Sequence, residues 1–398
     1  MQMKRYRMFW GLVVCLCMQL QAQIEQVPAY LKEYKEVYAQ NPRVAALKWF
    51  KEAKFGMMIS FSPASQLSGG TKEWIQTDEW HREKKQYEGL NRYARNLHLH
   101  RKFTEVSPRV EQLIRSFRPE HFNADSIAEV AVQAGMKYIT FTTHHVLGRM
   151  FMFDTSLSPW NSQNMLHRDF VKELADACEK RGLGLCLYVA PPNDHIHQEM
   201  KVMLRELLTN YGSIAAIWFD GIGECYRHPN EFVETGHLYQ YVRQLQPQCL
   251  VSFKTGFTGD EDFLAPEWSQ VKFDEKNTPL FNINVPTEQG ESLYAETLYR
   301  PVVRIYTGTP IYVRQNFKQV WVNELSEKPV ELCNPMLKGQ EWFDVKDGVH
   351  KTAAEIREEY DYTRSHHANY LLNVALRGDG SIHPLDKNAL KEFGNTLQ

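Results

Sequence analysis

The segment Ile-Ala-Ala-Ile-Trp-Phe-Asp-Gly, residues 214–221, decides the fold. Six uncharged residues end on Asp220, and Gly221 then allows the backbone to turn sharply. A run that is apolar at every position is typical of a strand that is covered on both faces, as in a parallel sheet. A carboxylate directly after such a strand is typical of barrel enzymes, in which polar groups gather where strands end. Aspartate also caps helices, so Asp220 alone leaves both interpretations open.

Short apolar runs recur along the chain and alternate with segments whose apolar residues have helical spacing. The runs are Phe55–Phe61, Tyr138–Thr143, Gly184–Ala190, Ala215–Phe219, Cys249–Phe253 and Tyr370–Ala375, and the helical segments are Asp125–Ala134, Asp169–Arg181, Gln198–Tyr211 and Glu231–Leu245. This alternation predicts parallel βα units. No Gly-rich dinucleotide-type turn follows the first run, so we expect an α/β fold of the (β/α)8-like TIM-barrel type rather than an open Rossmann sheet.

The domain organisation that we expect is a leader followed by one large domain. Residues 1–23 hold a basic start and the apolar run Met8–Leu20, which is typical of a signal peptide and shorter than the ~20 residues that span a bilayer. Residues 24–398 form a single barrel domain, with a long β-rich insertion at about 278–343. We therefore expect a periplasmic or secreted protein with no membrane span once the signal is removed.

Composition and charge exclude several classes of protein. The 398 residues are 43% hydrophobic and carry a net charge of −2, which excludes a disordered chain and gives no basic surface for a nucleic acid. The five cysteines after the signal lack CxxC spacing, which indicates neither a zinc site nor a disulfide framework. His195-Ile196-His197 has the spacing of a metal-binding pair, but Pro191 and Pro192 break the strand before it. We expect no metal and no other cofactor.

Polar side chains follow the predicted strands and should meet at one edge of the barrel. Asp220 and Glu267 are the best pair among them, because retaining glycoside hydrolysis needs one ionised and one protonated carboxyl group. His144 and His145 point to opposite faces if the chain is extended, so at most one would reach a shared ligand. A hydrogen-bonded pair in the core is the alternative for these histidines.

From about residue 45 to the end, a series of short motifs follow one another in a characteristic order. They include Trp49-Phe50-Lys51, Lys54–Ser60, Lys72-Glu73-Trp74, Phe117–Asp125, Ala134–Tyr138, Thr143-His144-His145, Trp160-Asn161, Arg168-Asp169, Leu187-Tyr188, Asn210-Tyr211-Gly212, Trp218–Gly221, Leu371–Val374 and Gly378-Asp379-Gly380. In type and order these motifs resemble the α-L-fucosidases of glycoside hydrolase family 29.

The resemblance implies a retaining exo-α-L-fucosidase on a (β/α)8-like barrel, acting without a metal on a fucosylated oligosaccharide or glycoconjugate. Asp220 matches the family's nucleophile, and Glu267, in Asp262–Glu267, matches the acid/base of one branch. In other members that role falls in a Trp-Glu-x-Cys segment, which Val330–Cys333 resembles, so Glu331 is the alternative. The sugar-binding positions of the family fall on Glu73, Trp74, His144, His145, Tyr188 and Trp218, with Lys254 in place of an Arg.

The chain also departs from the family at positions that contact the sugar. Ser60 and Phe61 stand where the family has a His that binds a fucose hydroxyl and a Trp, and Val146-Leu147-Gly148 replaces Asp-Gly-Phe. These changes leave open a related galacto-configured sugar as the substrate. They also leave open a catalytically silent relative that only binds a glycan. Few residues follow Gly380, so we expect no C-terminal β-sandwich of the kind common in the family.

Overall fold

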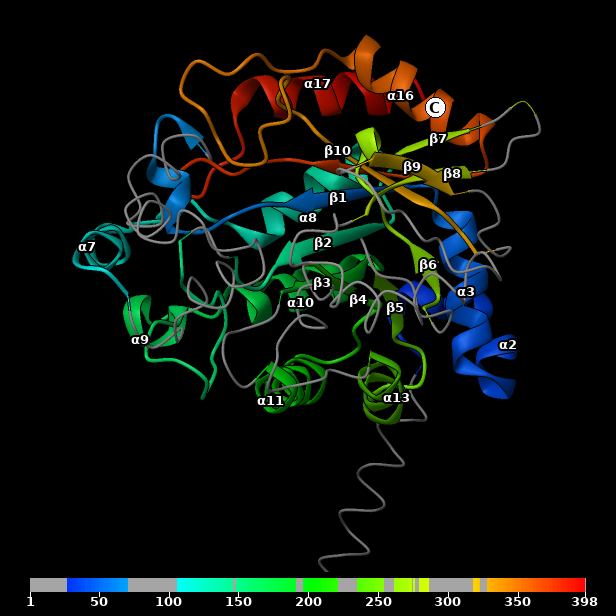
Figure 1. The fold of residues 1–398 in the computed structure, drawn as a ribbon, viewed down its shortest axis with the longest axis horizontal. Helices are drawn as coiled ribbons and strands as arrows, with labels where there is room; N and C mark the ends of the chain where they lie inside the picture. Colours follow the sequence, from blue (N-terminus) through cyan, green and yellow to red (C-terminus); the bar gives the residue numbers. More distant parts are fainter. Residues whose placement is uncertain are drawn as a thin grey trace, which may run out of the picture.

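Eight parallel strands form the central sheet of the molecule (Figure 1). The computed structural model describes residues 27–70, 106–145, 148–190, 196–220, 235–253, 261–273, 275, 279–285, 318–322 and 328–397. The strand order is β10-β11-β1-β2-β3-β4-β5-β6. The strands are β1 (Phe55–Ile59), β2 (Tyr138–Thr142), β3 (Gly184–Val189), β4 (Ala216–Phe219), β5 (Leu250–Phe253), β6 (Phe263–Leu264), β10 (Glu331–Pro335) and β11 (Asn369–Asn373).

The two edges of this sheet meet, because β6 and β10 are joined by parallel bridges. Leu264 pairs with Val330, and Glu267 pairs with Cys333. The Leu264 amide donates to the Pro329 carbonyl at 2.9 Å, and the Cys333 amide donates to the Pro266 carbonyl at 3.2 Å. The sheet is thus a nearly closed barrel, and the predicted (β/α)8-like fold is confirmed.

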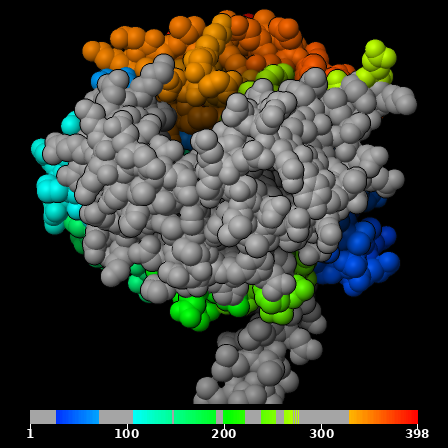
Figure 2. Space-filling view, viewed as in Figure 1, coloured from blue at the N-terminus to red at the C-terminus, as the bar shows by residue number. Residues whose placement is uncertain are grey.

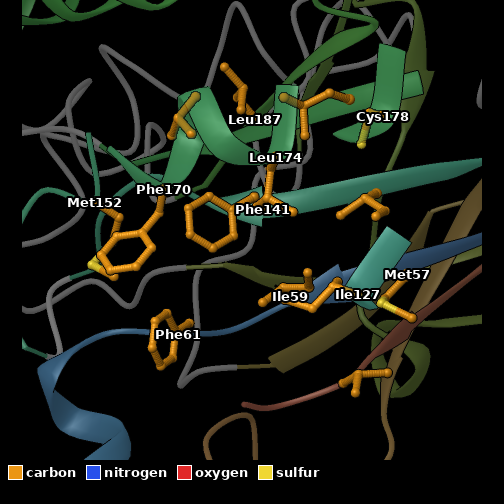
Figure 3. Packing of buried hydrophobic residues seen from close by; sticks show 14 of the residues in the cluster. Met57, Ile59, Phe61, Ile127, Phe141, Met152, Phe170, Leu174, Cys178 and Leu187 are labelled. Carbon is orange, nitrogen blue, oxygen red and sulfur yellow. The ribbon is translucent and has the colours of Figure 1, made fainter. Parts of the chain in front are cut away.

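Helices cover the outside of the barrel. They are α8 (Ala124–Gln133), α10 (Phe170–Arg181), α11 (Ile196–Asn210), α13 (Thr235–Leu245), α16 (Ala353–Ser365) and α17 (Pro384–Asn395), with η2 (Pro63–Gln66), α7 (Pro108–Ser116) and α9 (Ser162–Leu166) in the βα connections. In Figure 1, α16 and α17 lie above the strands, and α11 and α13 lie below them. Figure 3 shows Phe61, Phe141, Phe170 and Leu174 among the buried side chains between strands and helices.

The N-terminal helices close the end of the barrel where the strands begin. They are η1 (Ala29–Tyr34), α2 (Lys35–Gln40) and α3 (Pro42–Ala53), and they lie at the opposite end of the strands from α7 and α9 (Figure 1). Phe50 packs on Phe263, the first residue of β6, with ring centroids 4.2 Å apart. Gly184, the first residue of β3, lies so close to Trp49 that a Cβ there would be 2.5 Å from the indole.

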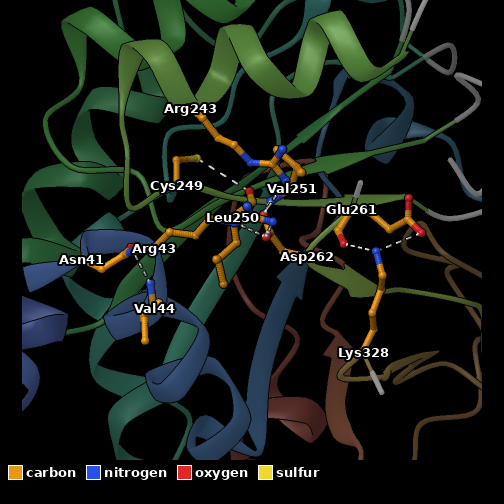
Figure 4. A network of polar contacts seen from close by, with 10 residues as sticks. All are labelled: Asn41, Arg43, Val44, Arg243, Cys249, Leu250, Val251, Glu261, Asp262 and Lys328. Atoms are coloured by element: carbon orange, nitrogen blue, oxygen red, sulfur yellow. Dashed lines mark hydrogen bonds and ion pairs between the residues drawn. The ribbon is translucent and has the colours of Figure 1, made fainter. Parts of the chain in front are cut away.

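A polar network fastens these helices to the start of β6 (Figure 4). Asp262, whose side chain is fully buried, accepts a hydrogen bond from Arg43 at 2.6 Å and one from the Val251 amide at 2.8 Å. Arg243 of α13 lies 3.4 Å from the same carboxylate. Because a buried carboxylate is costly without partners, these contacts explain how an acidic residue is accommodated directly before a barrel strand.

A second, three-stranded antiparallel sheet lies between β6 and β10 in the sequence. It follows η3 (Trp268–Gln270) and contains β7 (Val271–Phe273), β8 (Pro279–Val285) and β9 (Lys318–Val322). The range 278–343, predicted as the insertion, holds β8 and β9 and also the barrel strand β10. In Figure 2 the segment after β10 and helix α16, in orange, form the upper edge of the face in view.

The described residues include four cysteines, Cys178, Cys186, Cys249 and Cys333, and all are free and buried. Among the residues that the structure describes, no helix combines the length and the apolar character that crossing a membrane requires. The predicted signal peptide at 1–23 lies outside the described residues and stays a prediction.

Candidate active site

Asp220 lies directly beyond β4, beside the end of β3. Its amide donates to the carbonyl of Val189, the last residue of β3, at 3.0 Å. Its Oδ2 accepts a hydrogen bond from the hydroxyl of Tyr188 at 2.7 Å. Side chains alternate along a strand, so Tyr188, Trp218 and Asp220 all point to the interior of the barrel. Two neighbouring strands thus hold the Asp220 carboxylate at their carboxyl ends.

Glu267 belongs to the same group of side chains. It follows β6, is half-buried, and pairs with Cys333 of β10. Burial raises the pKa of Tyr188 well above its usual value, and the negative charges of Asp220 and Glu267 raise it further. The Tyr188 hydroxyl therefore stays protonated and donates a hydrogen bond to Asp220. The structure brings the two predicted carboxylates to the same end of the barrel.

The two histidines after β2 lie in different surroundings. His145 has its ring centroid 5.8 Å from that of Tyr188 and 5.3 Å from that of Phe343. His144 is fully buried and stacks on Phe151 with centroids 4.7 Å apart. Burial lowers the pKa of His144 to about 3, helped by the nearby His145 and Arg149, so this ring is neutral. His145 thus lies beside Tyr188, and His144 lies against Phe151.

Trp218 connects the candidate site to the interior of the barrel. Its indole stacks on the Tyr188 ring with centroids 5.5 Å apart and planes 23° apart. Its Nε1 donates to Oε1 of Glu331 at 2.9 Å, and the Tyr138 hydroxyl donates to Oε2 of the same carboxyl group at 2.6 Å. Glu331 is only 1% exposed. It is the first residue of β10, whereas Glu267 lies level with Cys333, two residues further along that strand.

Ser60, directly after β1, is fixed to the neighbouring strand. Its hydroxyl donates to Oδ1 of Asn373 at 2.8 Å, and Nδ2 of Asn373 donates to the Trp342 carbonyl at 2.9 Å. These bonds hold the segment after β10 over the barrel end, where Phe343 reaches His145. Sequence reasoning missed Asn373 and Phe343 as neighbours of the site. Asn373 lies within the predicted strand Tyr370–Ala375, which was the signal that could have identified it.

Several predicted residues lie outside the described part of the chain. They are Glu73, Trp74, Lys254 and His195, and the side chain of His197 is likewise not described. Within the described ranges, no group of three or more His, Cys, Asp or Glu side chains is arranged to hold a metal ion.

Comparison with known proteins finds alpha-L-fucosidases as relatives over most of the chain. A profile described as "Alpha-L-fucosidase" matches residues 20–293. Human tissue alpha-L-fucosidase is 33% identical over 377 residues, covering 88% of this chain and 67% of the human protein. Alpha-L-fucosidase 1 of Arabidopsis thaliana is 26% identical over 299 residues, covering 70% of this chain and 52% of that protein. The chain spans between about half and two thirds of the length of these relatives.

Solved structures share the fold. Alpha-L-fucosidase AlfC from Lactobacillus casei, in complex with its alpha-L-fucose product, superposes with a TM-score of 0.59 at 21% identity, over 88% of this chain and 97% of that one. Alpha-L-fucosidase isoenzyme 1 from Paenibacillus thiaminolyticus gives a TM-score of 0.59 at 22% identity, over 89% and 76% of the two chains. On the profile match and the human relative together, the chain belongs to the alpha-L-fucosidase family.

Proposed function

We propose that this protein is a retaining exo-α-L-fucosidase with Asp220 as nucleophile and Glu267 as acid/base. The observation that carries the proposal is that Asp220 and Glu267 lie at the carboxyl ends of the barrel strands, where Asp220 accepts a hydrogen bond from Tyr188 and Glu267 pairs with Cys333. Polar groups at that edge are the ones that perform chemistry in barrels of this type. Family membership supplies the substrate class, a terminal α-L-fucose or a related galacto-configured sugar on a glycan.

In the first step an oxygen of the Asp220 carboxylate attacks the anomeric carbon. The bond to the aglycone oxygen breaks, and that oxygen takes the proton of Glu267 as it leaves. In the second step the Glu267 carboxylate takes a proton from water, and the resulting hydroxide attacks the anomeric carbon and frees Asp220. Two displacements at one carbon restore its configuration. The Tyr188 hydroxyl donates a hydrogen bond to the attacking carboxylate and orients it between turnovers.

Burial and hydrogen bonding favour Glu267 over Glu331 as the acid/base. Both oxygens of Glu331 already accept hydrogen bonds inside the barrel, from Trp218 and Tyr138. Glu267 is half-buried at the carboxyl ends of the strands, level with Cys333 of β10. An acid/base must reach the glycosidic oxygen in one step and water in the next, which a fully enclosed carboxyl group does not.

Two variants test the assignment of the carboxylates. Asp220→Ala should abolish turnover of an aryl α-L-fucoside, while Asp176→Ala, at an exposed site on α10, should keep it. Glu267→Ala should lower kcat about 10²–10⁴-fold on a fucoside with a poorly acidic leaving group. It should lose far less on a dinitrophenyl fucoside, whose leaving group needs no proton. Wild-type turnover in Asp220→Ala would overturn the proposal.

The stereochemistry and the sugar are tested with the wild-type protein. Proton NMR during hydrolysis should show the α-anomer of the sugar appearing first, and first appearance of the β-anomer would contradict retention. Aryl α-L-fucoside, α-L-galactoside and β-D-galactoside, compared by kcat/KM, identify the preferred sugar. Calorimetric binding of L-fucose without turnover of any of the three would instead favour the silent glycan-binding relative.

A further inference from the structure

We propose that Glu331 is a positioning residue that holds the Trp218 indole from inside the barrel and, through it, orients Tyr188 and Asp220. The inference rests on the proposed function only for the role of Asp220. Glu331 is a buried acidic residue that has no role in the mechanism with Asp220 and Glu267, and the inference gives it one.

Direct contacts connect Glu331 to the candidate nucleophile in three steps. Oε1 of Glu331 accepts from the Trp218 indole N–H at 2.9 Å. The indole then stacks on Tyr188 at 5.5 Å, and the Tyr188 hydroxyl donates to Asp220 at 2.7 Å. The indole has one N–H, so its single hydrogen bond fixes how the ring is turned in its plane. A change at Glu331 therefore alters the surface on which Tyr188 lies.

The other oxygen of Glu331 is held by a side chain that cannot move away. Tyr138 donates to Oε2 at 2.6 Å, and its ring lies against the backbone of Gly56, where a Cβ would come within 2.2 Å of it. Trp49 and Phe50 of α3 pack on the same ring, at 6.1 and 5.7 Å between centroids. Because close-packed rings resist displacement, the Glu331 carboxyl group has one orientation, with one oxygen toward each donor.

The surroundings of Glu331 bring its ionisation into the neutral pH range. Burial raises the pKa of Glu331 to about 7, although the hydrogen bonds from Tyr138 and Trp218 lower it. Among the described residues, the titratable groups around it include Tyr138 of β2, Cys186 of β3 and Cys333 of β10 itself. Burial, with the charge of Glu331, raises the pKa of Tyr138 and of Cys186 well above their usual values, so both stay protonated as Glu331 ionises.

The hydrogen bond to Trp218 should therefore change strength with pH, because a carboxylate accepts more strongly than a neutral carboxyl group. We would record the indole N–H resonances of the full chain labelled with ¹⁵N-tryptophan, and assign Trp218 with Trp218→Phe. In the wild type the Trp218 resonance should titrate with a midpoint near pH 7. Glu331→Gln should remove this titration. Tyr138→Phe should move the midpoint to higher pH, because it removes a hydrogen bond that stabilises the ionised form.

Activity gives the second measurement. Glu331→Leu leaves the indole N–H without its acceptor and should lower kcat about tenfold with a smaller change in KM, the effect of losing about one buried hydrogen bond. Glu331→Gln should recover most of that loss, because its amide can accept from Trp218 and donate to Tyr138. If Glu331→Leu fails to fold, the resonances of Glu331→Gln and Tyr138→Phe still decide the question.

A Trp218 resonance that is independent of pH in the wild type, or that still titrates in Glu331→Gln, would overturn the inference. Failure of the proposed function would look different. Turnover in Asp220→Ala would remove the assigned nucleophile but would leave the Trp218 titration and its response to Glu331→Gln as described.

Discussion

The hydrogen bond between Tyr188 and Asp220 can be removed by deleting one oxygen atom, the hydroxyl of Tyr188. Tyr188→Phe deletes the hydroxyl and keeps the ring that stacks on Trp218. We expect kcat/KM to fall about 10- to 100-fold, because a hydrogen bond to a charged group contributes about 1.5–3 kcal/mol. Steady-state kinetics on an aryl α-L-fucoside measure the change.

Tyr211→Phe is the matched control for this variant. Its hydroxyl also donates to an aspartate at 2.7 Å, but Asp169 caps helix α10 outside the barrel. We expect this control to lower the free energy of unfolding without lowering kcat/KM. Equal losses of activity in the two variants would mean that the Tyr188 hydroxyl supports the fold rather than the reaction.

The sequence predicts which side chains reach the candidate site better than it predicts the residues that these side chains contact. Asp220 and Tyr188 lie at the ends of apolar runs, so the period of a strand is enough to point both inward. The role of Ser60 was not predictable in this way, because its partner Asn373 is more than 300 residues away and meets it only when β11 pairs with β1. Glu331 was an alternative acid/base in the sequence, and its burial and its two hydrogen bonds inside the barrel distinguish it from Glu267.

Among the elements, the segment between β10 and α16 carries a pH-sensitive contact. His350, near its end, lies 2.6 Å from Asp386 of α17, and its ring stacks on His383 at 4.1 Å. The hydrogen bond to Asp386 raises the pKa of His350 above its usual value, against an opposing effect of burial. The ion pair therefore contributes its full stability below pH 6.5 and loses it as the pH rises through the raised pKa of the folded protein.

Asp386→Asn tests this contact. We expect the variant to lose more thermal stability at pH 6 than at alkaline pH, because the wild-type pair loses its charge as the pH rises through the raised pKa of His350. Asp347→Asn, at an exposed position of the same segment, is the control and should show no such difference. Melting temperatures measured from pH 6 upward follow this loss, and a loss that is the same at every pH would contradict a charged His350.

Two barrel strands were not predictable from their own residues. β6 is two residues long and follows two acidic residues, and β10 contains Glu331 and Asn334 and ends in a proline. Neither pattern is an apolar run, because both strands are completed by long-range contacts. Glu331 is accommodated by donors on β2 and β4, and Asp262 by arginines on α3 and α13. Local patterns predict strands whose side chains pack on apolar neighbours, and they fail where polar partners come from elsewhere in the chain.

Across the whole molecule, side-chain contacts run along the interior of the barrel from the N-terminal helices to the candidate site. Phe50 of α3 packs on Tyr138, Tyr138 and Trp218 share Glu331, and Trp218 stacks on Tyr188 beside Asp220. The helices that close one end of the barrel therefore support the side chains that face the other end. The interior of the barrel links stability to the geometry of the site.

Phe50→Ala tests whether α3 is an integral part of this barrel. Phe50 is fully buried between Phe263 and Tyr138, and its carbonyl accepts from Asn369 of β11 at 2.8 Å. We expect a loss of about 3–5 kcal/mol in the free energy of unfolding, the range for removing a buried phenylalanine side chain. Val44→Ala, at a 48% exposed position of the same helix, should change it by less than about 0.5 kcal/mol. Denaturant unfolding of both variants should stay a single transition with an unchanged slope, because α3 and the barrel unfold together. A separate early transition in Phe50→Ala would instead show that the helix is an independent cap.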